Sequence, residues 1–148
     1  MSEMHKFVGS VKAIETWFHA AHHLTKGMSF MADHDILYDK IYNFFNEYFD
    51  QIVEKIMAIT GDETIACPVT ISQSVGQVLS QIPTPANKDS QEIAEISFNI
   101  IVNHLKEIEY AYEEFEKYEI MTKGMDDLLA SNYNELETFV YFLQRKLK

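Results

Sequence analysis

Hydrophobic residues recur at helical spacing along two long segments in the first half of the chain. In the first segment the apolar positions are four and three residues apart: Phe7, Val11, Ile14, Phe18 and Ala21. In the second, from about residue 29 to residue 59, they form one broad face: Leu37, Ile41, Phe45, Tyr48, Ile52 and Ile56. This spacing predicts two amphipathic helices, the first ending near Gly27 and the second at Gly61-Asp62.

The second half of the chain shows the same arrangement after a connection at 61–88. All three prolines lie in that connection, together with an amphipathic stretch that predicts a short helix at Ile71–Ile82. A third long helix is predicted over about 90–121, with Gly124 ending the unit, and a fourth from 126 to the last residue. Two helix pairs joined by a crossover with a short helix predict an all-α, ferritin-like four-helix bundle, with the whole chain, residues 1–148, in one domain.

Composition and charge narrow the function classes. Of the 148 residues 47% are hydrophobic, which is enough to bury a core and argues against disorder. The formal net charge of −11 argues against nucleic-acid binding and suits the attraction of metal cations. The lone Cys67 cannot form an intrachain disulfide and is expected to be a small buried hydrophobe.

The start of the chain and the length of its apolar runs indicate where in the cell the protein is expected. His5 and Lys6 interrupt any apolar run at the start of the chain, so no signal peptide is expected. No apolar stretch reaches the roughly 18 residues that a membrane-spanning helix needs. The sequence therefore predicts a soluble, cytoplasmic protein without membrane attachment.

Three carboxylates share one face of the second predicted helix. On a helical wheel Asp39, Asp50 and Glu54 lie within roughly 60° of one another, away from the apolar face. Asp50 and Glu54 are one turn apart, whereas Asp39 lies about 16 Å from Asp50 along the axis. If two copies of this helix pack antiparallel across a two-fold axis, Asp39 of one copy approaches Asp50 and Glu54 of the other, which makes two shared sites. The alternative is that this carboxylate stripe is simply a solvated helix face.

Histidines cluster near the turn between the first two predicted helices: His19, His22, His23 and His34. His22 lies at the edge of the apolar face and is the better candidate ligand. His19 and His23 are expected on the surface, or at most in an outer shell around a metal. Carboxylates together with imidazoles are the ligand set that suits iron, manganese or zinc rather than copper(I).

The residues around this turn resemble a known family. The run from His22 to Gly27, followed by Phe30 and His34, is similar to the pattern His-Trp-x-x-x-Gly-x-x-Phe-x-x-x-His of the Dps proteins, or mini-ferritins. The later run Asp50-x-x-x-Glu54-Lys55-Ile56 resembles the family's Asp-x-x-Ala-Glu-Arg-Ile. Weaker similarity continues into the last helix, at Asp127, Leu128, Leu129, Glu135, Tyr141 and Leu143.

This resemblance implies a ferroxidase site between two-fold related subunits. The implied ligands are His22, His34 and Asp39 of one subunit with Asp50 and Glu54 of the other. The implied function is oxidation of iron(II) by peroxide or oxygen and storage of the product in a hollow dodecamer, which protects against oxidative stress. Iron is the expected metal, with zinc and manganese as substitutes. The lysine-rich tail with which some Dps proteins bind DNA is missing, so DNA binding is not expected.

One spacing departs from the family pattern. His34 and Asp39 are separated by one residue more than usual, which in a regular α-helix turns His34 about 100° away from the carboxylate stripe and leaves Asp35 near it. Either a one-residue π-bulge returns His34 to the site, or Asp35 replaces it as the ligand. The intact spacing from Gly27 through Phe30 to His34 favours the bulge.

Two other functions fit the same sequence. A shell with this fold could bind iron or zinc without efficient oxidation, because of the extra residue. Alternatively, a helical bundle without metal could act as an interaction protein, with its charged stripe solvated and its histidines incidental. Absence of two-fold pairing through the second helix would favour the interaction protein.

Overall fold

The chain folds entirely into helices and loops in a computed structural model that describes residues 2–148. The elements, in order, are α1 (Glu3–Leu24), α2 (Phe30–Ala32), a π-helical segment (Asp33–Tyr38), α3 (Asp39–Thr60), a 3-10 turn (Glu63–Ala66), α4 (Pro68–Leu79), α5 (Ser90–Lys117) and α6 (Lys123–Leu147). No strand occurs within these described residues. The predicted all-α class is therefore confirmed.

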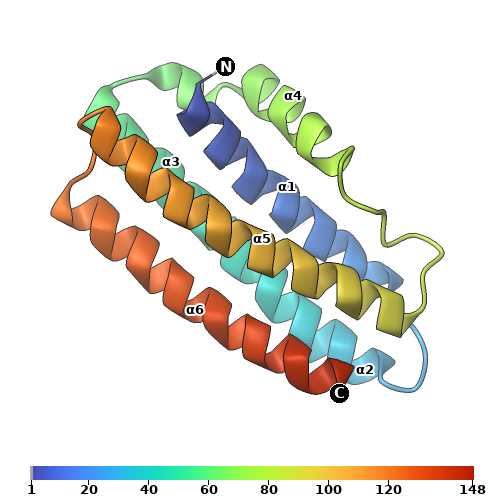
Figure 1. The fold of residues 1–148 in the computed structure, drawn as a ribbon. Coiled ribbons are helices and arrows are strands. Elements are labelled where there is room, and N and C mark those ends of the chain that lie inside the picture. Colours follow the sequence, from blue (N-terminus) through green and yellow to red (C-terminus); the bar gives the residue numbers. More distant parts are fainter. Residues whose placement is uncertain (1) are drawn as a thin grey trace.

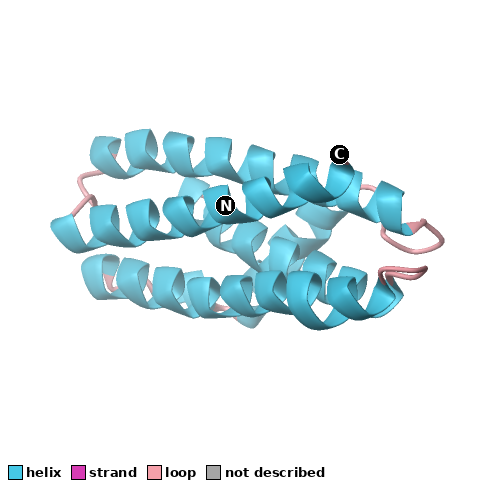
Figure 2. Cartoon of the chain, turned by 90° about the horizontal axis from the view of Figure 1, so that it is seen from below, coloured by secondary structure: helices cyan, strands magenta, loops and turns pink. Residues whose placement is uncertain are grey.

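The four long helices form a ring in which each helix packs against two others. Helix α1 contacts α3 and α5, and α6 contacts the same two helices from the other side (Figure 1). The crossover between α3 and α5 carries α4, which packs along α1 and returns the chain to the end where α3 began. Figure 2 shows the long helices lying along a common direction. Helices that are neighbours in the ring therefore run antiparallel, while α3 and α5 run the same way.

The core lies inside this ring and consists of the apolar positions that the spacing predicted. The predicted positions on α1 (Phe7, Val11, Ile14, Phe18 and Ala21) are buried, as are Ile41, Phe45, Tyr48, Ile52 and Ile56 on α3. The ring of Phe18 stacks on that of Phe45, with centroids 6.1 Å apart. Burying a large apolar side chain contributes about 1.5–3 kcal/mol, so this core fixes α1 firmly against α3.

Two predicted boundaries are wrong, each for a local reason. Gly124 does not end the third helix; it lies in the first turn of α6, because the hydroxyl of Thr122 accepts a hydrogen bond from the amide of Met125 and caps that helix. The short helix is Pro68–Leu79 rather than Ile71–Ile82. Proline suits the first helical position, since its missing N–H would have no partner there.

The length and apolar content of each helix decide whether it could span a membrane. Within residues 2–148, none of the helices combines the length and the apolar character that crossing a bilayer requires.

Candidate functional site

The helix that carries the candidate carboxylates is preceded by the π-helical segment Asp33–Tyr38, hereafter the π segment. It ends where α3 begins, at Asp39. A π turn holds one residue more than an α turn, and this is the stretch in which the sequence has one extra residue. The expected bulge is therefore present, and it turns His34 toward α1.

His22 of α1 and His34 of the π segment form a closely packed histidine pair. Their rings are stacked, with centroids 3.8 Å apart and planes 16° from parallel. Nδ1 of His22 donates to the carbonyl oxygen of His34 at 2.7 Å, and Nδ1 of His34 donates to the carbonyl oxygen of His22 at 2.6 Å. Because a carbonyl can only accept, both Nδ1 atoms carry the proton. In the neutral rings, the Nε2 atoms then have lone pairs available for a metal.

A buried ion pair holds the π segment in place. Asp33, only 4% exposed, accepts a hydrogen bond from Ser29 at 2.7 Å and lies 3.0 Å from the ammonium of Lys146 near the end of α6. Sequence reasoning missed Asp33, because its partner is more than a hundred residues away. The Ser29–Asp33 spacing of one helical turn is the local signal that could have suggested its role.

Aromatic rings pack against both members of the histidine pair, one stacked and the other edge-on. Phe30 stacks on His34 at 5.0 Å between centroids, and Tyr42 of α3 packs against His22 at 5.1 Å. Partial burial and then the charge of Asp39 raise the pKa of Tyr42. Tyr42 thus connects the histidine pair with the first turn of α3, where Asp39 lies.

Asp35, the alternative ligand suggested by the spacing, lies beside His34. Its Oδ1 is 3.7 Å from Nε2 of His34, and its side chain is 59% exposed. His34 and Asp35 are therefore close enough to serve the same ion.

Asp50 and Glu54 lie further along α3, exposed and one turn apart. Eleven residues of helix separate Asp39 from Asp50, which is about 16 Å along the axis. Within residues 2–148 of one chain, no three His, Cys, Asp or Glu side chains are grouped so that they could hold one metal ion. A single chain thus brings His22 and His34 together, with Asp35 beside His34, and leaves Asp50 and Glu54 apart.

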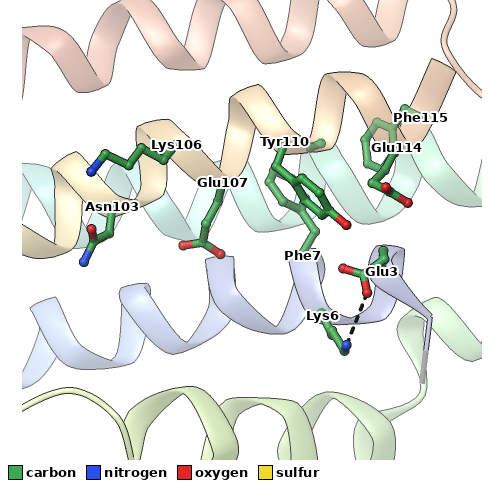
Figure 3. Close-up of a pocket in the computed structure, with 10 residues that line it drawn as sticks. Glu3, Lys6, Phe7, Asn103, Lys106, Glu107, Tyr110, Glu114 and Phe115 are labelled. Atoms are coloured by element: carbon green, nitrogen blue, oxygen red, sulfur yellow. Dashed lines mark hydrogen bonds and ion pairs between the residues drawn. The ribbon is translucent and has the colours of Figure 1, made fainter. Parts of the chain in front are cut away.

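One cavity borders the exposed carboxylates of α3, and another lies far from the histidine pair. A polar cavity of about 560 Å³ between α3 and α6 is lined by Glu54 together with Lys55 and Asp127. A more apolar cavity of about 320 Å³ lies between α1 and α5, where Figure 3 shows Phe7 and Tyr110 between the two helices. Phe7 is fifteen residues before His22 on α1, about 22 Å along the axis, so this second cavity is not part of the histidine site.

A polar cluster around one buried histidine was also missed from the sequence. His104 of α5 is fully buried, with Nε2 3.4 Å from the hydroxyl of Tyr48 and Nδ1 3.4 Å from the carboxylate of Glu107. Burial, followed by the charge of Glu107, raises the pKa of Tyr48. This cluster connects α3 with α5 and lies on the core side of α3, opposite Asp50 and Glu54.

Comparisons with known proteins add no family to this geometry. No protein-family model matches the chain, and no curated protein matches it significantly.

Proposed function

We propose that this chain is the subunit of a ferritin-like, Dps-type shell that oxidises iron(II) and stores the product, with each oxidation site shared between two copies. The observation that carries the proposal is the reciprocal hydrogen bonding of His22 and His34. Metal-binding histidines characteristically donate their second ring N–H to a carbonyl or carboxylate, which fixes both tautomer and orientation. Here two imidazoles do so for each other's backbone, and the Nε2 atom of each ring is left available to bind metal.

The π segment supports a functional rather than incidental origin of this arrangement. π-Helical turns are rare and are found frequently at functional sites. In this chain the turn coincides with the one residue by which the spacing from His34 to Asp39 exceeds the Dps pattern. It thus compensates for the departure that otherwise argues against the resemblance.

The second half of the proposed site comes from another copy. Asp39 and Asp50 of one chain are about 16 Å apart along α3 and cannot bind the same ion. Antiparallel pairing of two α3 helices across a two-fold axis brings Asp39 and the histidine pair of one copy to Asp50 and Glu54 of the other. Two identical mixed sites result from one symmetric contact.

The donors fit iron(II) as the substrate. Imidazole and carboxylate suit iron, zinc and manganese, and the carboxylates offset the rise in charge when iron(II) becomes iron(III). Two iron(II) ions each give one electron to a peroxide molecule, whose O–O bond breaks to yield two hydroxide ions. The role of the protein is to hold the ions with open coordination positions for the oxidant.

The negative charge of the chain is consistent with storage of iron inside an assembly. A subunit with a formal net charge of −11 gives an assembly of many copies a strongly negative field that draws in cations. The Dps resemblance supplies the expected number of subunits, twelve, and zinc or manganese are the expected substitutes for iron.

The proposed function is tested by the rate of iron(II) oxidation in a variant that lacks the Asp50 and Glu54 carboxylates. Iron(II) oxidation with added peroxide is followed by absorbance for wild type and for Asp50→Ala/Glu54→Ala, with particle mass measured for both. Glu63→Ala/Glu95→Ala, which removes two exposed carboxylates elsewhere, is the matched control. Fast oxidation by wild type and control, lost in an equally assembled Asp50/Glu54 variant, is the expected result. An assembled wild type that oxidises iron no faster than buffer would instead indicate a metal-binding shell without ferroxidase activity, and a monomer without metal uptake would exclude both.

A further inference from the structure

Two further histidines on α1, His19 and His23, lie outside the proposed ligand set. They are one helical turn apart, and their rings lie side by side, with centroids 4.9 Å apart and planes 33° from parallel. Both side chains are exposed. The hydrogen-bonded imidazoles among residues 2–148 are those of His5, His22, His34 and His104, so His19 and His23 have uncommitted ring nitrogens.

This geometry is that of a two-histidine chelate on a helix. Histidines four residues apart on one helix face are a recurrent zinc-binding arrangement. Two nitrogens bound to one zinc ion at about 2.0–2.1 Å each must lie within roughly 4 Å of one another. Neighbouring rings with centroids 4.9 Å apart can present one nitrogen each within that limit.

The surroundings restrain one ring and favour a cation. His19 stacks on Tyr42 of α3, with centroids 4.4 Å apart and planes 20° from parallel, which limits rotation of the imidazole. The pKa of Tyr42 is raised by partial burial, by the charge of Asp39 and, more weakly, by that of Glu15. The carboxylate of Asp39 therefore contributes negative potential at this end of the α1–α3 interface, whereas that of Glu15 is paired with Lys12.

We propose that His19 and His23 form a second binding site for a divalent transition metal on the surface of α1, with water completing the coordination. Imidazole ligands select zinc, nickel, copper or iron over magnesium or calcium. The ring of His23 lies 5.0 Å from that of His22, so an ion held here is next to the histidine pair. The site needs only one helix of one chain, and it does not depend on the shared oxidation site.

The alternative is that His19 and His23 are simply solvated surface histidines. A zinc titration distinguishes this alternative from a metal site. Zinc is titrated against the full chain in competition with a chromophoric zinc indicator, without iron or peroxide. We expect the variant His19→Gln/His23→Gln to bind one zinc ion fewer per chain than wild type. Each single variant should bind that ion at least about tenfold more weakly than wild type, because a chelate requires both rings.

Two control variants make the result specific. His5→Gln removes an imidazole whose two nitrogens are already bonded to Ser2 and Thr64, and it should keep the full zinc stoichiometry. His22→Asn/His34→Asn should keep the ion bound by His19 and His23 even if it abolishes iron oxidation. Equal zinc stoichiometry and affinity in wild type and His19→Gln/His23→Gln would overturn the proposal, as would single variants that each bind the ion as tightly as wild type.

Discussion

His22 and His34 each donate Nδ1–H to the other's backbone carbonyl, at 2.7 and 2.6 Å. The two bonds tie the end of α1 to the π segment and hold both rings in one tautomer. Each side chain therefore has a structural role through Nδ1 and a proposed metal-binding role through Nε2. A useful variant must remove one role and keep the other.

Replacement of His34 by asparagine makes that separation. The asparagine amide can still donate to the carbonyl of His22 from about the position of Nδ1, but it has no atom in place of Nε2. We expect His34→Asn to keep the melting temperature within a few degrees of wild type and to lower the iron oxidation rate by roughly 10- to 100-fold. His34→Ala, which removes both groups, should lose stability as well. Unchanged oxidation in His34→Asn would show that Nε2 is not a ligand.

The π segment can be tested through its length. Ile36 is an exposed residue within it, and its deletion permits a regular α-helix through this stretch. We expect the deletion variant to stay folded by circular dichroism but to lose the contact between His22 and His34, and with it most of the iron oxidation. Ile36→Ala keeps the chain length and should retain activity, so equal activity in both variants would contradict the role given to the π segment.

The long helices were predictable because many positions support each of them. In the second predicted helix six apolar positions repeat at helical spacing, and the five that lie in α3 are all buried. The π turn was predictable only by comparing the spacing of His34 and Asp39 with a family pattern. Its anchor Asp33 was not, because nothing near it in the sequence indicates that Lys146 will close over it. His104 was missed for a similar reason, since its neighbours Tyr48 and Glu107 are recognisable only once α3 and α5 are side by side.

The ion pair between Asp33 and Lys146 should be important for stability. Its carboxylate is only 6% exposed, and removing one partner of a buried pair leaves the other charge uncompensated. We expect Asp33→Asn to lower the free energy of unfolding by about 2–3 kcal/mol, measured by urea denaturation. Glu3→Gln, which breaks the exposed pair with Lys6, is the control and should cost less than about 1 kcal/mol. Equal losses in the two variants would show that Asp33 does not anchor the π segment.

Glu107 should make stability depend on pH. Burial raises the pKa of Glu107, but the hydrogen bond and charge of His104 and the hydrogen bond of Ser10 lower it by more, so the net pKa is below the ordinary value of 4.5. A carboxyl with a depressed pKa stabilises the fold above its unfolded pKa and loses that contribution as pH falls through its folded pKa. We expect Glu107→Gln to be less stable than wild type at pH 7.

The same difference should disappear in acid. Urea denaturation of wild type and Glu107→Gln is repeated as the pH is lowered from about 5 to about 3, where the native carboxylate becomes protonated. Glu113→Gln, an exposed carboxylate on the same helix, reports the effect of losing one charge alone. A stability gap between wild type and Glu107→Gln that stays constant down to pH 3 would contradict the ionised state of Glu107 in the fold.

Mixing two inactive half-site variants tests the shared site most directly. His22→Asn/His34→Asn lacks the histidine half, and Asp50→Ala/Glu54→Ala lacks the carboxylate half, so neither should oxidise iron(II) efficiently alone. When the two are unfolded together and reassembled in equal amounts, half of the two-fold pairs contain one chain of each kind, and each such pair has one complete site of two. We expect activity to return to roughly a quarter of the wild-type value. A co-assembled mixture no more active than either variant alone would contradict a site built between two copies of the chain.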